Sequence, residues 1–204
     1  MKVKICGITN VEDAKLCSNL GADAIGFIFH KKSKRYVEPE LVKKMISKLP
    51  PFLIKVGVFV NERSSTVNKI ADYVKLNVVQ LHGDELPEYL EKIKYPTIKA
   101  FRVNDDFNFE NLNDYENHSF LLDSLHLKEY GGTGLKFDWD KIPNDIKNKI
   151  ILAGGISEEN IEKIYNEVCP YAIDVSSSVE IEPGKKDHNK LKSLFAKINE
   201  VRKT

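Results

Sequence analysis

Short apolar runs alternate with stretches of helical periodicity along the whole chain. Runs such as 24–29 and 150–153 are apolar at successive positions, which is typical of parallel strands buried on both faces. The pattern predicts eight strands, near residues 2–6, 23–29, 53–60, 77–81, 96–101, 119–123, 149–153 and 171–175. Between them it predicts helices near 10–20, 39–48, 64–75, 87–94, 138–147, 157–167 and 187–202. The polar, Asn-rich segment 105–117 indicates that the helix after the fifth strand is short or absent.

Local signals at the helix ends support this alternation. Asn10 suits the N-cap of the first helix, and Gly21 suits the residue that follows it. Pro39 and Pro87 are placed where a first helical turn accepts proline. Ser157 is predicted to cap the helix that follows the seventh strand.

Strict alternation of strand and helix leaves two main architectures, the (β/α)8 barrel and an open doubly wound sheet. Glycine-rich and hydroxyl-rich segments follow the seventh and eighth strands, where many barrels bind phosphate. A chain of 204 residues, 42% of them hydrophobic, suits one domain with a sizeable core. We therefore predict an α/β protein with a single compact (β/α)8 TIM barrel that spans residues 1–204.

Composition narrows the possible partners. The net charge of +1 produces no general attraction to nucleic acid or to a membrane, and no apolar run approaches the ~20 residues that cross a bilayer. The three cysteines, at positions 6, 17 and 169, fit neither a disulfide framework nor a zinc site. We predict a cytoplasmic protein that binds no metal, nucleic acid or membrane, and that is a monomer or a homodimer.

Two strand ends carry candidate catalytic groups. Cys6 closes the first strand, and a thiolate at that place acts as a base or nucleophile if its pKa is lowered. Asp123 closes the sixth strand, where a carboxyl group beneath an apolar rim suits a general acid. The plain alternatives are a buried core thiol at Cys6 and an N-cap or loop-ordering carboxylate at Asp123.

Other strand ends predict a binding pocket for an anion. Gly154 and Gly155 precede a helix start, and Ser176 and Ser177 follow the eighth strand, so their backbone amides suit a phosphate. Arg35 follows the second strand, and its planar guanidinium suits a carboxylate clamp. His82 follows the fourth strand and is either a site residue or a structural histidine, and Arg102 follows the fifth strand. A further candidate segment is the long loop at 124–136, which suits a mobile lid and contains Gly131, Gly132, Thr133 and Gly134.

In order along the chain, these residues resemble the phosphoribosylanthranilate isomerase family, barrel enzymes of tryptophan biosynthesis. The resemblance covers nearly the whole chain, and the joint match is highly specific. The matching segments are Lys4–Thr9 (KICGIT), Gly26–Val37 (GFIFHKKSKRYV), Gly57–Val60 (GVFV), Val79–Gly83 (VQLHG), Lys99–Val103 (KAFRV), Leu121–Asp123 (LLD), Gly131–Gly134 (GGTG), Phe137–Trp139 (FDW), Leu152–Ile156 (LAGGI), Asp174–Glu180 (DVSSSVE) and Pro183–Asp187 (PGKKD).

The resemblance implies an Amadori rearrangement of N-(5-phosphoribosyl)anthranilate to 1-(2-carboxyphenylamino)-1-deoxyribulose 5-phosphate. Asp123 would protonate the ring oxygen, and Cys6 would remove the C2 proton of the resulting Schiff base. Arg35 would bind the anthranilate carboxylate, while His82 and Asp174 would line the substrate site. The phosphate would be held at Gly154, Gly155, Ser176 and Ser177, and residues 131–134 would belong to the closing loop. Such an internal redox reaction needs no electron acceptor, so we expect no cofactor.

The chain departs from the family pattern at three places. Ser178 replaces a usual glycine, which would cost about 1 kcal/mol if that position requires a positive φ. Lys34 replaces the usual proline before Arg35, and Leu135 with Lys136 replaces the usual Lys-Thr pair after the glycine loop.

Two rival functions are also compatible with the sequence. Another phosphosugar barrel enzyme would share the phosphate site without needing Cys6 and Asp123 together, and substrate specificity would distinguish it. A barrel retained as a binding module would bind the phosphorylated ligand without turnover and would be indifferent to the substitution Cys6→Ser.

Overall fold

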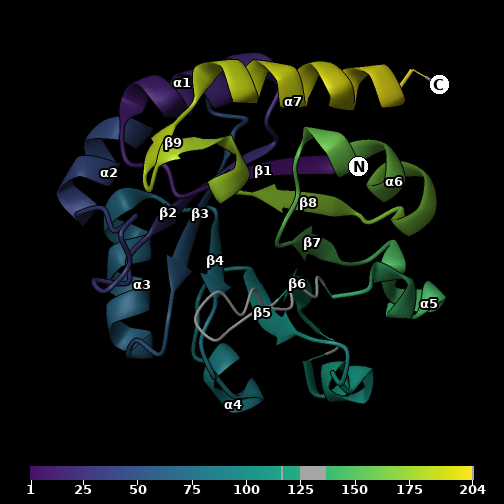
Figure 1. The fold of residues 1–204 in the computed structure, drawn as a ribbon. Coiled ribbons are helices and arrows are strands. Elements are labelled where there is room, and N and C mark those ends of the chain that lie inside the picture. Colours follow the sequence, from purple (N-terminus) through teal and green to yellow (C-terminus); the bar gives the residue numbers. More distant parts are fainter. Residues whose placement is uncertain (116, 125–136, 204) are drawn as a thin grey trace.

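A closed barrel of parallel strands forms the centre of the molecule (Figure 1). The computed structural model describes residues 1–115, 117–124 and 137–203. Each strand pairs in parallel with its neighbours in chain order, and β1 closes the ring against β8. The strands are β1 (Lys2–Cys6), β2 (Ala24–Ile28), β3 (Ile54–Phe59), β4 (Val78–Leu81), β5 (Thr97–Val103), β6 (Ser119–Ser124), β7 (Ile151–Ala153) and β8 (Ala172–Val175).

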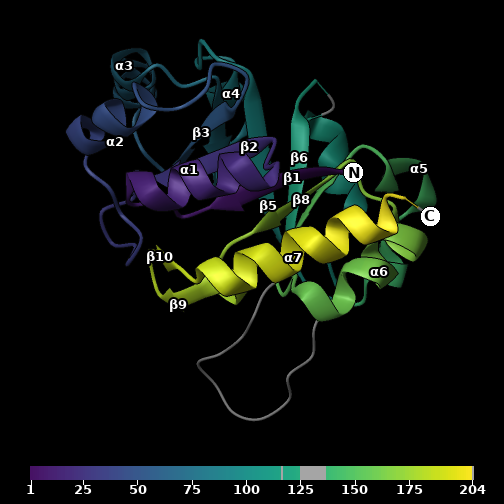
Figure 2. The same cartoon turned by 90° about the horizontal axis from the view of Figure 1, so that it is seen from above.

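Helices connect the strands and surround the barrel (Figures 1 and 2). The α-helices are α1 (Val11–Leu20), α2 (Pro39–Ile46), α3 (Ser64–Val74), α4 (Pro87–Leu90), α5 (Asn144–Lys147), α6 (Ile161–Lys163) and α7 (His188–Val201). The 3-10 segments are η1 (Phe109–Tyr115), η2 (Trp139–Lys141), η3 (Glu158–Asn160) and η5 (Ser177–Val179), and η4 (Ile164–Val168) is a π-helix. No helix in the described part of the chain is long and apolar enough to cross a membrane.

The predicted barrel is confirmed, and its eight strands lie within about two residues of their expected bounds. Asn10 accepts a hydrogen bond from the Asp13 amide at 2.8 Å, and Gly21 ends α1 with a φ of 101°. The helix expected at 157–167 is instead divided among η3, α6 and η4. The segment at 105–117 contains a 3-10 helix in place of an α-helix, as the polar sequence there indicated.

Side chains alternate between two apolar layers. Outward-facing strand residues such as Val3 and Ile5 pack under the helices in the larger hydrophobic cluster. The smaller cluster, which includes Ala100, Leu121 and Ala153, gathers inward-facing residues of the strands. By this alternation, Lys4 and Cys6 both face inward from β1, which places a charged and a reactive side chain inside the barrel.

A short antiparallel hairpin after β8 was not predicted. It consists of β9 (Glu180–Glu182) and β10 (Lys185–Lys186), and it leads directly into α7 (Figure 2). Gly184, with a φ of 89°, supplies the turn between the two strands. The hairpin brings the buried side chains of Glu180 and Lys186 to the end of β1, next to the pocket described below.

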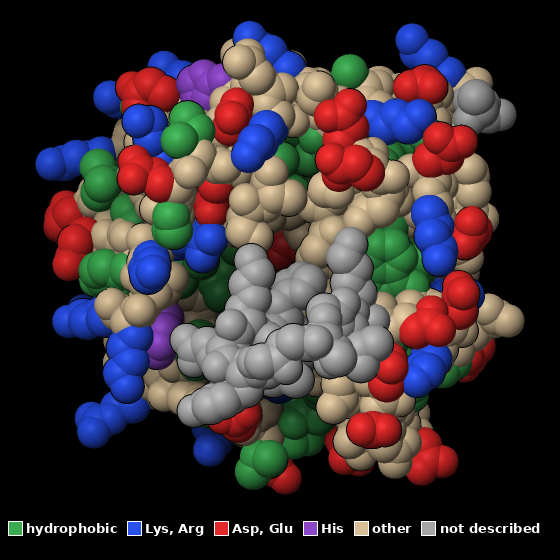
Figure 3. All heavy atoms as spheres, viewed as in Figure 1, with side chains coloured by type: hydrophobic (Ala, Val, Ile, Leu, Met, Phe, Trp, Pro, Cys, Tyr) green, Lys and Arg blue, Asp and Glu red, His purple; other side chains and the backbone are tan. Residues whose placement is uncertain are grey.

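Charged side chains of both signs occur across the face shown in Figure 3, as expected for a net charge of +1. Near-neutral surfaces of mixed sign create no strong long-range field. The chemistry therefore depends on the local arrangement at the barrel mouth.

Candidate active site

A cavity of about 590 Å³ opens at the carboxyl ends of the barrel strands. Enzymes with this fold place their reacting groups at this end. Residues predicted from the sequence meet there although they lie far apart along the chain. Those that line the cavity are Cys6, Arg35, His82, Arg102, Asp123, Gly154, Gly155, Asp174, Ser176 and Ser177. The predicted closing loop, Gly131, Gly132, Thr133 and Gly134, lies outside the described residues.

Cys6 sits at the floor of this cavity beside a buried ion pair. Its side chain is 7% exposed. Lys4 Nζ lies 2.6 Å from Asp174 Oδ2, and both side chains are buried. Lys4 and Asp174 are register partners on β1 and β8, so the pairing of the two strands itself brings the charges together.

Burial raises the pKa of the Cys6 thiol, although the Lys4 ammonium acts in the opposite direction. The condition set from the sequence for a reactive thiolate, a lowered pKa, is therefore not met by the surroundings of Cys6. Burial also raises the pKa of the Asp174 carboxyl against the opposing charge of Lys4. Burial lowers the pKa of Lys4, but Asp174 and Cys6 more than offset this, so the ammonium stays charged.

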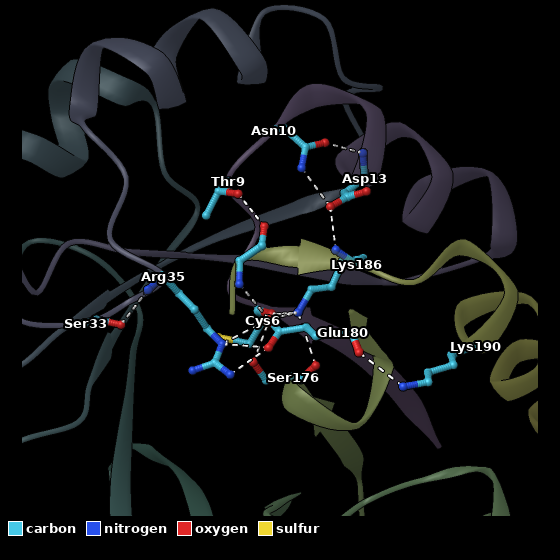
Figure 4. Close-up of polar contacts among 11 residues, drawn as sticks. Cys6, Thr9, Asn10, Asp13, Ser33, Arg35, Ser176, Glu180, Lys186 and Lys190 are labelled. Carbon is cyan, nitrogen blue, oxygen red and sulfur yellow. Dashed lines mark hydrogen bonds and ion pairs between the residues drawn. The ribbon is translucent and has the colours of Figure 1, made fainter. Parts of the chain in front are cut away.

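Arg35 is held by a carboxylate that the sequence reasoning missed (Figure 4). Its Nε donates to both Glu180 oxygens at 3.0 Å, and its Nη2 donates to Oε2 at 2.6 Å. Arginine has five N–H donors in a planar fork, so the Nη1 side of the guanidinium is left for a further anion. The sequence assigned Arg35 to a substrate carboxylate, and the structure leaves it a free edge facing the cavity.

Lys186 anchors this arrangement from below. It is fully buried, and its Nζ donates to the Cys6 carbonyl oxygen at 2.6 Å, to Glu180 Oε1 at 2.9 Å and to the Ser176 carbonyl oxygen at 3.2 Å. Burial alone would raise the pKa of Glu180, but hydrogen bonds from Arg35 and Lys186 hold it below its usual value. Lys186 thus ties the end of the Cys6 strand to the loop after β8.

His82 and Asp123 are neighbours across the mouth of the barrel. His82 Nε2 lies 3.3 Å from Asp123 Oδ2, and the Gln80 amide nitrogen lies 3.1 Å from His82 Nδ1. With the Gln80 amide nitrogen as donor, Nδ1 accepts, which places the proton of a neutral imidazole on Nε2, the ring nitrogen close to Asp123. Sequence reasoning did not predict this contact of Gln80, a buried polar residue of β4 that lines the cavity.

The loop after β7 approaches Asp123 closely because it begins with glycine. Gly154 has a φ of 83°, and a Cβ there would lie 2.8 Å from Asp123 Oδ1 and 2.7 Å from the Ser124 amide nitrogen. Gly155 continues with a φ of 66°. Asn160 holds the loop by accepting from the Ser157 amide at 3.0 Å and donating to the Gly155 carbonyl at 2.8 Å.

Ser178 does not cause the strain considered from the sequence. Among the described non-glycine residues, positive φ values occur at Asn61, Lys75 and Cys169 and not at Ser178. Ser178 lines the cavity, and its hydroxyl oxygen is buried without a hydrogen-bond partner among the described residues. The serine therefore fits the loop without the backbone cost that a left-handed conformation would impose.

No group of His, Cys, Asp or Glu side chains within residues 1–115, 117–124 and 137–203 has an arrangement that would hold a metal ion. The cavity instead offers a thiol, carboxyl groups, a guanidinium edge and glycine-rich backbone. These groups suit proton transfer on a small anionic substrate.

The fold and the cavity define a protein of the TIM-barrel class whose cavity groups suit acid–base chemistry. The model of the N-(5'-phosphoribosyl)anthranilate (PRA) isomerase family matches residues 3–197. The chain belongs to this family, and it is therefore an isomerase of tryptophan biosynthesis.

Individual relatives agree over the full length. The N-(5'-phosphoribosyl)anthranilate isomerase of Pelobacter propionicus is 45% identical over 203 residues, covering 99% of this chain and 97% of the relative. A phosphoribosyl anthranilate isomerase structure in complex with reduced 1-(o-carboxyphenylamino)-1-deoxyribulose 5-phosphate superposes with a TM-score of 0.87 at 41% identity, covering 98% and 99% of the two chains. Monomers generated from the dimeric Thermotoga maritima isomerase give a TM-score of 0.85 at 38% identity, covering 98% of both chains.

Proposed function

We propose that Asp123 and Cys6 carry out the isomerisation of N-(5'-phosphoribosyl)anthranilate as general acid and general base. Asp123 donates a proton to the ribose ring oxygen, and the C1–O bond breaks to leave a Schiff base. Cys6 then removes the proton from C2, and the enolamine tautomerises to the aminoketose. The substrate and product are isomers, so the sequence of steps requires no external oxidant or reductant.

The observation that carries this proposal is the placement of the two groups. Cys6 ends β1 and Asp123 lies near the end of β6, and both line one cavity from different sides of the barrel. A positioned acid or base contributes about 10²–10⁴ in rate. His82 Nε2 lies 3.3 Å from Asp123 Oδ2, and the absence of a side chain at Gly154 leaves the space that this carboxyl occupies.

Arg35 binds the anthranilate carboxylate through the guanidinium edge that Glu180 leaves free. Two parallel N–H donors match the two carboxylate oxygens, and the partly buried setting strengthens both hydrogen bonds. Glu180 and Lys186 fix the direction in which the fork points. Asp174 accepts from a sugar hydroxyl, which is supported by its buried Oδ1 that has no partner among the described residues.

The phosphate is bound by backbone groups of two adjacent loops. Gly154 and Gly155 follow β7, and Ser176 and Ser177 follow β8, so both loops line the same part of the cavity. Glycine brings the backbone close to a ligand, and amides at the start of helical turns attract anions. This site would hold the substrate at the end opposite to the anthranilate ring.

A fluorescence assay tests the proposal, with the substrate made in situ and no metal or nucleotide in the isomerase step. Wild-type protein and the variant Cys169→Ala should consume the substrate at the same rate, because Cys169 is an exposed thiol that precedes β8 at the other end of the barrel. Cys6→Ala and Asp123→Asn should each lose orders of magnitude in kcat while remaining folded. Near-normal turnover in either variant would refute the role of that residue.

We also propose that the chain forms a homodimer in the cytoplasm. Phe52 is 97% exposed between α2 and β3, and Ile54 beside it is also exposed. The Thermotoga maritima relative is described as dimeric. The reducing setting is supported by the free thiols of Cys6, Cys17 and Cys169.

A further inference from the structure

Lys4 is a charged residue in the interior of the barrel that the proposed mechanism does not use. Its side chain is 4% exposed, and its ammonium pairs with Asp174 at 2.6 Å. A buried ion pair is a poor way to gain stability, because removing two charges from water costs about as much as their attraction returns. The position of this pair beneath the reacting groups suggests a different purpose.

The Lys4 ammonium lies next to the Cys6 sulfur. A Cβ at position 26 would lie 2.7 Å from Cys6 Sγ and 3.2 Å from Lys4 Nζ, so both atoms surround the space that Gly26 leaves empty. They are therefore within ~6 Å of each other, the range in which an opposite charge favours an ionised partner. Cys6 and Gly26 are register partners on β1 and β2, so the strand pairing creates this arrangement.

Charges of both signs face Cys6 from the surrounding elements. Lys4 on β1 and Lys186 on β10 favour the thiolate, while Asp174 on β8 opposes it. Arg35 also interacts with the Cys6 charge, but its guanidinium is bound to Glu180, as is the Lys186 ammonium. Lys4 differs from the other two cations because its ion-pair partner among the described residues, Asp174, has one carboxylate oxygen that accepts no hydrogen bond there.

We propose that Lys4 is a positioning residue whose ammonium holds Cys6 ready to become the thiolate, with Asp174 fixing the ammonium at that place. The proposal rests on the assignment of Cys6 as the general base. When Cys6 gives up its proton, the new negative charge on sulfur lies beside the Lys4 ammonium. That ammonium then interacts with two anions, the Cys6 thiolate and the Asp174 carboxylate. The S–H bond breaks, the proton leaves to water, and the electron pair stays on sulfur.

The test measures the ionisation of Cys6 in protein without substrate. The rate of alkylation by iodoacetamide is followed against pH, and the modified Cys6 peptide is quantified by mass spectrometry. Cys169 in the same sample is the internal reference, because it is exposed and remote from Lys4. Lys55→Met is the matched control, since Lys55 is a buried lysine of β3 whose ammonium donates to the backbone carbonyls of Pro50 and Pro51.

Opposite shifts are expected from the two members of the ion pair. Lys4→Met should raise the midpoint of Cys6 alkylation by about 1–3 pH units, the usual effect of a nearby opposite charge. Asp174→Asn should lower it, because Lys4 then faces the thiol without a competing carboxylate. Cys169 should keep its midpoint in every variant, and Lys55→Met should leave Cys6 unchanged.

A double variant guards against a loss of folding in Lys4→Met, which leaves the Asp174 carboxylate unpaired. In the Asp174→Asn background, adding Lys4→Met replaces two buried charges with neutral groups, a change that buried pairs tolerate. The Cys6 midpoint should again rise when Lys4 is removed. Equal midpoints with and without Lys4 in both backgrounds would overturn the proposal.

Turnover separates this inference from the proposed function. In Lys4→Met, the limb of the pH profile of kcat/KM that reports the ionisation of Cys6 should move with the alkylation midpoint, while a merely structural role would lower kcat without moving that limb. If Cys6→Ala is inactive but Lys4→Met moves neither midpoint nor limb, only the role of Lys4 is refuted. If Cys6→Ala turns over normally, the general base itself is refuted.

Discussion

Glu180 is the residue whose removal should most clearly show how the substrate clamp is built. Its carboxylate, on β9, accepts three hydrogen bonds of 2.6–3.0 Å from Arg35 and one of 2.9 Å from the buried Lys186. Glu180→Gln keeps the shape of the side chain but removes the charge that these two cations share. Breaking a buried pair costs about 3–5 kcal/mol, and the acceptor that glutamine retains favours the lower end.

A loss of about 3 kcal/mol lowers the melting temperature of a protein of this size by about 6–12 °C. Calorimetry at pH 7 measures it, with Glu182→Gln as the control because Glu182 is exposed on the same strand. KM should also rise, since Arg35 loses the contact that directs its free edge. kcat should change less, because the hydrogen bonds of the Glu180 carboxylate among the described residues go to Arg35, Gly184 and Lys186 and not to Cys6 or Asp123.

The stabilising effect of Glu180 should also depend on pH, and the direction of this dependence follows from its pKa. Arg35 and Lys186 hold the pKa of Glu180 below its usual value, so its stabilising effect is fully present above the unfolded value of about 4.3. The effect is lost as the pH falls through the lower pKa of the folded state. The difference in melting temperature between wild type and Glu180→Gln should therefore shrink below about pH 4. Equal melting temperatures at pH 7, or a difference that grows in acid, would refute the role of Glu180.

Two further substitutions test the geometry of the site and the assembly. Gly154→Ala should reduce the free energy of unfolding by about 1–2 kcal/mol and also lower kcat, because the added Cβ would press on Asp123. Gly21→Ala is the control: Gly21 has a similar positive φ, but a Cβ there would meet nothing within 4 Å, so this variant should lose stability alone. Unfolding by urea and kcat measure the two effects, and equal kcat values in both variants would contradict the close approach. Phe52→Asp should convert a dimer to a folded monomer in sedimentation experiments, and a wild-type monomer at micromolar concentration would refute the proposed assembly.

The barrel was predictable because its strands are continuous apolar runs and its helices carry clear end signals. Cys6 and Asp123 could be selected because each closes such a run, and parallel strands in a barrel bring their ends together. Asp174 was selected only through the family resemblance. The β9–β10 hairpin escaped prediction, although Pro183 and Gly184 are a turn signal, because strands of two or three residues show no periodicity.

Lys4, Glu180 and Lys186 were missed for a different reason. Charged side chains are mostly exposed, so a lysine within a strand suggests an edge or a solvent-facing position. Lys4 is two residues before Cys6, so both side chains point to the same face of β1. This spacing was the one signal in the sequence that Lys4 faces the barrel interior. The partners of Glu180 and Lys186 come from distant segments, and only the folded chain shows them.

The division of labour between Asp123 and Cys6 is tested most directly by the kinetic isotope effect of substrate deuterated at C2. In Asp123→Asn, ring opening becomes slow, so the isotope effect on kcat/KM should disappear. In Cys6→Ser, removal of the C2 proton by a much weaker base becomes slow, so the full primary isotope effect should appear. The reverse pattern, or the same isotope effect in both variants, would contradict the assignment of the acid to Asp123 and the base to Cys6.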